Sequence, residues 1–331
     1  MSDSNDLPTA NTHADRLVSF VIPAMNEQGS LEKLHAEICR VCTEHGIRRE
    51  IIFIDDGSTD RTWQVMQSLA QRDTDTSAIR FRRNFGKAAA LEAGFAQCKG
   101  DIAITMDADL QDDPDEIPRF LDKMDDGFDV VSGWKRVRHD PWHKVLPSRV
   151  FNGLVSTMTG VKLHDHNCGY KSYRREIFDN VRLYGERHRF VPVLAAAQGW
   201  KVTEIEVLHH AREFGQSKYG VSRLLKGFLD LITIYLLTGF SGRPLHLIGG
   251  IGMFFFGAGG VGICYLTIRW CVSRLSDSMA DLHLHETAIF YYCILSVLLG
   301  AQFLLAGLLA ELIVSRSDNR NSVYSIAERL S

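Results

Sequence analysis

The chain has 331 residues, a formal net charge of −3 and a hydrophobic content of 45%. This length allows one α/β domain of about 200–240 residues and a smaller second part. The nearly balanced charge excludes nucleic-acid binding as a property of the whole protein, because that needs a strongly basic surface. Residues 1–16 are polar and lack the apolar core of a signal peptide, so we expect a disordered lead-in.

Short apolar segments that alternate with helical patterns predict a mostly parallel sheet. The expected strands are residues 17–22, 50–54, 78–82, 102–106 and 129–132, and the expected helices include 30–44, one capped by Thr59 or Asp60, and 87–98. Each of the first four strands ends in a polar cluster. Because ligands collect at the carboxyl ends of parallel strands, these clusters predict one shared site.

The cluster after the fourth strand has the composition of a metal site. Asp107, Asp109 and Gln111 are spaced by two residues, so an extended chain would point them the same way. Their hard oxygen atoms suit Mg²⁺ or Mn²⁺. A solvated acidic turn is the alternative, whereas an EF-hand is excluded because Asp112 stands where that loop needs glycine.

Other common cofactor motifs are absent from the sequence. No GxGxxG follows the first strand and no GxxxxGK[ST] occurs, which excludes a typical dinucleotide oxidoreductase and a P-loop NTPase. A metal is therefore expected to carry the charge of a diphosphate. Cys39 and Cys42 have CxxC spacing, but they lie in a helical pattern without a second pair, so we expect no zinc site there.

Four segments, in this order and spacing, resemble the family-2 glycosyltransferases of the GT-A fold: PAMNE (23–27), IDDGSTDRT (54–62), RNFGKAAAL (83–91) and MDADLQDDPDEIP (106–118). Three later segments are similar to the polyprenyl-phosphate branch of that family: DHNCGY (165–170), ERHRFVP (186–192) and REFGQSKY (212–219). That branch includes dolichol-phosphate mannose synthases and bacterial undecaprenyl-phosphate glucosyltransferases. The resemblance covers about residues 17–314.

The resemblance implies a nucleotide-sugar site at the shared edge. The residues it assigns to the nucleotide sugar are Pro23, Asn26, Glu27, Asp55, Asp56, Gly86, Lys87 and Asp107, with Arg212, Ser217 and Lys218 in a flexible segment that closes over the nucleotide. It gives Asp107, Asp109 and Gln111 to a Mg²⁺ or Mn²⁺ ion held against the diphosphate. Asp165 would orient the donor sugar or a cation on the acceptor side. The polar clusters after the first two strands have an alternative explanation, in which they form only a turn and the N-cap of the helix that follows.

Residues 135–149 form a basic segment with five Lys or Arg residues and one acid. A solvated basic face is the usual explanation, but apolar runs later in the chain favour an anionic lipid phosphate. The resemblance implies that Lys135, Lys144 and Ser148 contact this acceptor phosphate, and Arg149 belongs to the same segment. The family often has Arg in place of Lys135 and Lys144, and Lys lacks the bidentate fork of Arg.

The C-terminal third predicts a membrane anchor. Leu247–Ile268 and Ala288–Ala310 carry no charge, and each would span about 33 Å as a helix, enough for a hydrocarbon core of about 30 Å. Seven glycines in the first run allow close packing on the second run or on another copy of the chain, so a homo-oligomer is one expected partner. Basic residues at the outer ends of the pair favour cytoplasmic termini and a cytoplasmic catalytic domain at the plasma or inner membrane.

These observations divide the chain into parts. We expect a lead-in (1–16), a GT-A domain (17–218), an amphipathic helix at the membrane surface (219–243), a transmembrane unit (244–314) with spans near 247–268 and 288–310, and a cytoplasmic tail (315–331). For the amphipathic segment, a core helix is the alternative.

The sequence thus predicts a membrane-anchored, metal-dependent glycosyltransferase that moves a sugar from a nucleoside diphosphate to undecaprenyl or dolichyl phosphate for the cell envelope. A phosphate monoester is already a nucleophilic anion at neutral pH, because its second pKa is about 6, so positioning matters more than a strong base. Inversion at the anomeric carbon is implied by the resemblance. UDP-glucose is the first expected donor. The alternatives are a dolichol-phosphate-mannose-type synthase using GDP-mannose and a non-catalytic, lipid-bound sensor of sugar nucleotides.

Two lysines test the division between donor and acceptor. Lys144→Ala is expected to raise the KM for polyprenyl phosphate, whereas Lys218→Ala is expected to weaken nucleotide binding without lipid. Each loses a hydrogen bond to a charged group worth about 1.5–3 kcal/mol, or roughly ten- to more than a hundredfold in affinity. Calorimetry with nucleoside diphosphate and metal separates the two. Equal loss of nucleotide binding would place the basic segment on the donor side.

Overall fold

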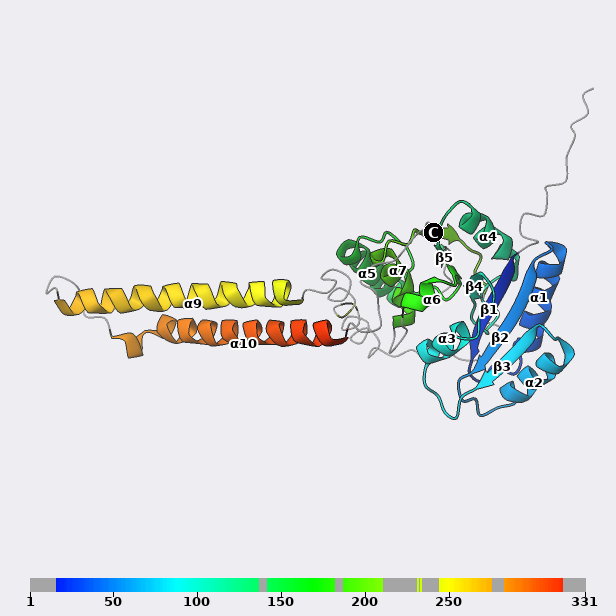
Figure 1. The fold of residues 1–331 in the computed structure, drawn as a ribbon, viewed down its shortest axis with the longest axis horizontal. Helices are drawn as coiled ribbons and strands as arrows, with labels where there is room; N and C mark the ends of the chain where they lie inside the picture. The colour runs from blue at the N-terminus through cyan, green and yellow to red at the C-terminus, as the bar shows by residue number, and fades with distance from the viewer. Residues whose placement is uncertain are drawn as a thin grey trace, which may run out of the picture. The chain divides into compact units, whose positions relative to one another are not determined.

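The computed structural model describes residues 16–136, 142–181, 187–210, 231, 233, 244–275 and 283–317, with residues 142–149, 180, 187 and 314–317 described by their backbone alone. The chain divides into two compact units, Met1–Ile234 and Tyr235–Ser331. The first contains the sheet and the second contains a pair of long helices (Figure 1).

A seven-stranded sheet organises the described part of the first unit, in the order β3-β2-β1-β4-β6-β5-β7. The strands are β1 (Leu17–Ala24), β2 (Arg48–Asp55), β3 (Thr76–Arg80), β4 (Ile102–Thr105), β5 (Val130–Trp134), β6 (Lys171–Arg174) and β7 (Val202–Glu206). Only β6 runs antiparallel to its neighbours, β4 and β5. The mostly parallel sheet of an α/β fold is therefore confirmed.

Helices connect the strands and cover both faces of the sheet. They are α1 (Leu31–Glu44), α2 (Thr62–Arg72), α3 (Lys87–Phe95), α4 (Ile117–Asp125), α5 (Trp142–Thr159), α6 (Ile177–Asn180) and α7 (Val191–Ala197), with short 3₁₀ turns η1 (Pro114–Glu116) and η2 (Arg187–Phe190). Successive residues of a strand point to opposite faces, so Phe20 and Ile22 join a core with α1, α2 and α4, whereas Val21 joins a second core with α3, α6 and α7. Burial on both faces explains why these strands have continuous apolar sequences.

Several details differ from the sequence predictions, and β7, like β6, was not predicted. β3 begins two residues earlier than expected, and α2 has Arg61 at its N-cap, although Asp60 accepts a hydrogen bond from Thr62 N at 2.9 Å. β6 was not predicted, because its sequence, KSYR, has no apolar run. Its backbone pairing with β4 and β5 places it inside the sheet. The predicted amphipathic helix at 219–243 lies outside the described residues, apart from positions 231 and 233.

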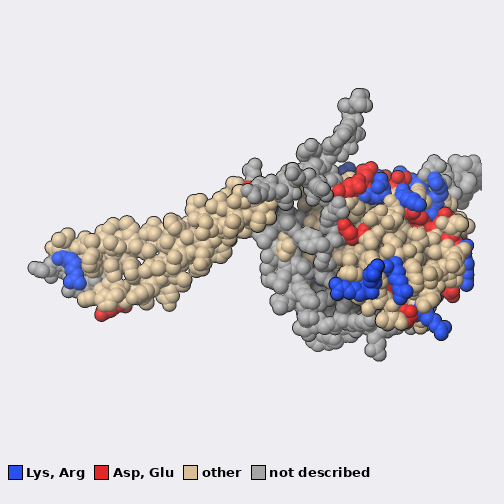
Figure 2. All heavy atoms as spheres, turned by 60° about the horizontal axis from the view of Figure 1, so that its bottom comes forward, with Lys and Arg blue, Asp and Glu red and all other residues tan. Residues whose placement is uncertain are grey.

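The second unit contains α9 (Pro244–Leu275), the short turn η3 (Leu284–Glu286) and α10 (Ala288–Ser317). The two long helices, α9 and α10, have mean hydropathies of 1.8 and 2.3. Nevertheless, only 17% and 11% of the residues in their most apolar stretches are buried in the structure. A helix in the core of a soluble protein would be mostly covered. In Figure 2 most of this surface carries no Lys, Arg, Asp or Glu. Both helices are long and apolar enough to cross a membrane, as predicted.

Glycines allow α9 and α10 to approach closely. A Cβ atom built on Gly300 would lie 2.4 Å from the backbone nitrogen of Phe256, and one on Gly252 would lie 2.8 Å from that of Leu304. By contrast, a Cβ on Gly257 would meet nothing within 4 Å. The glycine-rich surface predicted from the sequence therefore has one side packed on α10 and one side open.

Gly300→Ala is expected to weaken the helix pair by about 1–3 kcal/mol, because the new methyl group meets backbone atoms that cannot move independently. Gly257→Ala is the matched control and should leave stability unchanged or slightly higher, since alanine is the better helix former. Unfolding by sodium dodecyl sulfate in mixed micelles measures both. Equal midpoints for the two variants would contradict the packing described.

Candidate functional site

The loops after β1 and β2 are tied together by Asn26. Its backbone has φ +59°, a left-handed conformation that asparagine tolerates. Its backbone nitrogen donates to Ser58 Oγ at 2.9 Å, and its side-chain oxygen accepts from Thr59 N at 2.9 Å. Two segments assigned to the nucleotide, Pro23–Glu27 and Asp55–Asp56, thus meet at the carboxyl edge.

The paired aspartates at the end of β2 point in different directions. Asp55 is fully buried, accepts a hydrogen bond from Ser58 N at 2.8 Å and lies 3.2 Å from Arg80 Nε. Asp56 accepts from the backbone nitrogens of Phe85 at 2.7 Å and Gly86 at 3.0 Å. Burial raises the pKa of Asp56. Asp55 therefore shapes its own turn, whereas Asp56 connects β2 to the segment that opens α3.

Lys87, the first residue of α3, forms an ion pair with Asp107 at the end of β4. Both side chains lie against Gly169, where a Cβ would be 2.8 Å from Lys87 Nζ and from Asp107 Oδ2. Burial raises the pKa of Asp107, but Lys87 and Lys135 outweigh this and lower it to about 2. Asp107 is therefore a carboxylate at any physiological pH.

The predicted metal ligands lie on a turn. The chain was expected to leave β4 extended, but Leu110 has φ +60° and reverses its direction. Asp109 is 5% exposed, and its Oδ1 accepts from Gln111 N at 3.3 Å. The side chain of Gln111 donates to the carbonyl of His210 at 3.4 Å. Two carboxylates and an amide oxygen fit Mg²⁺ or Mn²⁺, and Asp107 already holds one cationic group.

Lys135 lies beneath this turn rather than on an open basic face. Its ammonium group is 2.8 Å from Asp112 Oδ1, with 13% of the lysine side chain and none of the aspartate side chain exposed. The other oxygen of Asp112 accepts from the backbone nitrogen of Asp107 at 3.2 Å. Burial opposes the charged form of Lys135, but Asp112 outweighs it and raises the lysine pKa. Whether Lys135 also reaches an acceptor phosphate stays a prediction.

Asp165 belongs to a buried polar turn. It is 2% exposed and accepts from Asn167 N at 3.0 Å. Nearby, Lys171 of β6 donates from Nζ to the carbonyl of His166 at 3.0 Å, and burial lowers the pKa of Lys171 to about 8. This turn carries Gly169 to the Lys87–Asp107 pair, and Thr105 Oγ1 holds it there with a bond of 2.7 Å to the carbonyl of Gly169.

His188, for which no role was predicted from the sequence, lies within electrostatic reach of Lys87 and Asp107. Burial and the charges of Lys87, Arg189 and Lys171 lower its pKa well below the usual value, so the ring is neutral. Its Nδ1 atom is buried and has no hydrogen-bond partner among the described residues. The signal was present in the segment ERHRFVP at 186–192, which was used for the family resemblance alone.

The remaining predicted residues have no described side chains. Lys144, Ser148 and Arg149 lie on α5, whose backbone is described there. Arg212, Ser217 and Lys218 lie outside the described residues. The described chain before them returns to the turn that holds Asp109 and Gln111, because His210 N donates to the carbonyl of Gln111 at 3.0 Å.

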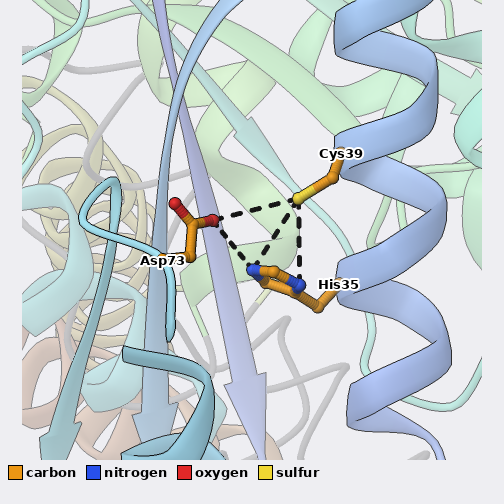
Figure 3. Close-up of side chains that lie close together, drawn as sticks. All are labelled: His35, Cys39 and Asp73. Atoms are coloured by element: carbon orange, nitrogen blue, oxygen red, sulfur yellow. Dashed lines mark hydrogen bonds and ion pairs between the residues drawn. The ribbon is translucent and has the colours of Figure 1, made fainter. Parts of the chain in front are cut away.

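A separate cluster on the described chain has the composition of a metal site (Figure 3). Cys39 Sγ lies 3.7 Å from His35 Nε2 and 3.9 Å from Asp73 Oδ2. However, the same oxygen of Asp73 accepts from His35 at 2.9 Å, from Thr76 at 2.9 Å and from Arg49 at 3.0 Å. Arg49 already supplies the positive charge, so hydrogen bonding between α1 and the start of β3 explains this cluster.

Known proteins resemble this chain in sequence and in fold. Residues 19–182 match the domain described as Glycosyl transferase family 2. The undecaprenyl-phosphate 4-deoxy-4-formamido-L-arabinose transferase of Edwardsiella ictaluri is 36% identical over 299 residues, which cover 90% of this chain and 89% of that protein. The protein of the same name from Salmonella paratyphi B is 38% identical over 297 residues, covering 89% and 88%.

Among solved structures, glucosyl-3-phosphoglycerate synthase from Mycobacterium tuberculosis, in complex with Mn²⁺, uridine diphosphate and phosphoglyceric acid, aligns with a TM-score of 0.52. It is 19% identical, and the alignment covers 67% of this chain and 78% of that one. At this identity the likeness shows the GT-A fold alone. Sequence relatives that match almost nine-tenths of the chain establish more: the protein belongs to glycosyltransferase family 2, and within it to the polyprenyl-phosphate glycosyltransferases.

Proposed function

We propose that this enzyme transfers a sugar from a uridine-diphosphate donor to undecaprenyl phosphate. The observation that carries the proposal is the convergence of Asp56, Lys87 and Asp107 at the carboxyl edge of the sheet, beside the turn that holds Asp109 and Gln111. The second unit of the same chain has two helices long and apolar enough to cross a bilayer, which supports a lipid acceptor.

The donor half of the site divides its work among neighbouring loops. Pro23, Asn26, Glu27 and Asp56 would line the nucleobase and ribose, and Asp55 and Gly86 would shape the loops around them. Asp107, Asp109 and Gln111 would hold a divalent cation, which supplies the positive charge that stabilises the departing diphosphate. Arg212, Ser217 and Lys218 would add contacts to the diphosphate.

The acceptor half binds an anion that needs little activation. Lys135, Lys144, Ser148 and Arg149 would orient the lipid phosphate so that its oxygen faces the anomeric carbon. This oxygen forms the new bond to the sugar while the bond to the diphosphate breaks. Asp165 would position the sugar or one of the basic side chains on the acceptor side. It is suited to this role because it is buried and anchored to its own turn.

The transferred sugar has two candidates. The activity for which the sequence relatives are named favours 4-deoxy-4-formamido-L-arabinose. Glucose, the sugar expected from the sequence, is the second. A single hydroxyl or methylene in an apolar pocket changes discrimination by only about 1–3 kcal/mol, so small pocket differences decide between them.

The membrane arrangement is also a proposal. Cytoplasmic termini and a cytoplasmic catalytic unit would give the site access to nucleotide sugars, while α9 and α10 anchor the chain in the plasma or inner membrane. The open glycine side of α9, which includes Gly250, Gly257 and Gly260, could pack on a second copy.

A donor panel tests the reaction. Purified enzyme in detergent, with undecaprenyl phosphate and Mn²⁺ or Mg²⁺, is expected to release UDP from UDP-4-deoxy-4-formamido-L-arabinose or from UDP-glucose, and to need both lipid and metal. Mass spectrometry of the lipid product identifies the sugar. Release of UDP without lipid phosphate, or a glycosylated product other than the lipid, would contradict the proposal.

Asp109→Asn is expected to lower turnover by roughly 10²–10³-fold at saturating metal, because it removes a negative charge from the cation site with little change of volume. Asp126→Asn, on the exposed end of α4, is the matched control and should retain wild-type turnover. Steady-state UDP release measures both. Asp109→Asn turnover within a few-fold of wild type would exclude Asp109 from the cation site.

A further inference from the structure

Lys87 lies between the two halves of the donor site. The residue before it, Gly86, donates its backbone N–H to Asp56 at 3.0 Å, on the side proposed for the ribose. The Lys87 ammonium group itself pairs with Asp107, on the side proposed for the metal. A diphosphate joined to a ribose at Asp56 and to a cation at Asp107 must therefore pass near Lys87, at the positive N-terminus of α3.

Gly169 closes one side of the Asp107 carboxylate, while 34% of the Asp107 side chain stays exposed. Gly169 packs against it so closely that a Cβ there would lie 2.8 Å from Asp107 Oδ2 and 2.9 Å from Asp107 Oδ1. The same Cβ would be 2.8 Å from Lys87 Nζ, so backbone closes one side of the pair. A divalent cation on this carboxylate would also repel the ammonium group at short range.

We propose that Lys87 is a place-holder for the divalent cation: it neutralises Asp107 before substrate binds and turns to the diphosphate when nucleotide and metal enter together. This inference rests on the proposed role of Asp107 in the cation site. It assigns to Lys87 a positioning role that changes during the binding sequence, beyond a fixed contact to the nucleotide.

Two consequences follow from the exchange of partners. Metal alone binds weakly, because the ion pair between Lys87 and Asp107 must break before the cation can bind. Metal in the presence of a nucleoside diphosphate binds more tightly, because the ammonium group exchanges a carboxylate for a phosphate. Lys87 therefore makes the binding of the two ligands cooperative, and the enzyme avoids holding metal without its donor.

Direct Mn²⁺ binding tests the proposal. The full-length protein in detergent is titrated with Mn²⁺, with and without UDP, and free Mn²⁺ is followed by electron paramagnetic resonance. Lys87→Gln is expected to bind Mn²⁺ alone roughly tenfold more tightly than wild type, from the loss of one charge-assisted contact on Asp107. The same variant should gain less affinity for Mn²⁺ from UDP than the wild-type enzyme gains.

Matched variants make the result specific. Lys123→Gln, which removes an exposed lysine 2.9 Å from Asp126, should bind Mn²⁺ as wild type does. Lys87→Met should agree with Lys87→Gln, and it replaces that variant if Lys87→Gln does not fold, as judged by thermal unfolding. Asp109→Asn should lose the tight binding and so identifies the site measured.

The outcomes separate this inference from the function on which it rests. Weaker or unchanged Mn²⁺ affinity in the neutral Lys87 variants, or an undiminished gain in Mn²⁺ affinity from UDP, would overturn the place-holder role and leave the cation site intact. The gain from UDP is the decisive measurement, because loss of any positive charge beside Asp107 tightens the binding of Mn²⁺ alone. Absence of Mn²⁺ binding by the wild-type protein, even with UDP, would overturn both proposals.

Discussion

The carboxylates at the carboxyl edge of the sheet must stay charged while they are packed among protein atoms, and the rest of the catalytic unit is arranged around that requirement. Burial disfavours an ionised carboxylate, so each one needs a compensating donor or cation. Asp107 has Lys87, Asp112 has Lys135, and Asp56 has two backbone N–H groups. Removal of one partner would be most destabilising at the Asp112–Lys135 pair, because 13% of the lysine side chain and none of the aspartate side chain is exposed.

This compensation links segments that are far apart in the chain. Asp56, in the loop after β2, holds the start of α3, which in turn presents Lys87 to Asp107, two residues after β4. Gly169, more than sixty residues later, closes the pair because it has no side chain, and Thr105 fixes its carbonyl. The hydrogen bonds and ion pairs of this network form only when every segment is in place, so the carboxyl edge of the sheet becomes ordered as a unit.

The second unit is built on the opposite principle. Its helices carry little charge and approach through glycines, where each missing side chain lets backbone contact backbone. In a bilayer the hydrophobic effect does not favour helix association over contact with lipid, so close packing of this kind holds the pair together. Paired charges thus fix the arrangement of the catalytic unit, whereas glycines fix the packing of α9 on α10.

The sequence by itself determined the α/β class, the two apolar helices and the family, because these depend on periodic patterns and short motifs that are local in the chain. It also identified Asp56, Lys87, Asp107 and Asp109 as candidates. Only the tertiary structure decided how these residues are surrounded: the Asp112–Lys135 pair beside the turn of Asp109 and Gln111, the approach of Gly169, the insertion of β6 and the neutral His188. These contacts join residues separated by tens of positions. Burial and neighbouring charge, which set their roles, exist only once the chain has folded.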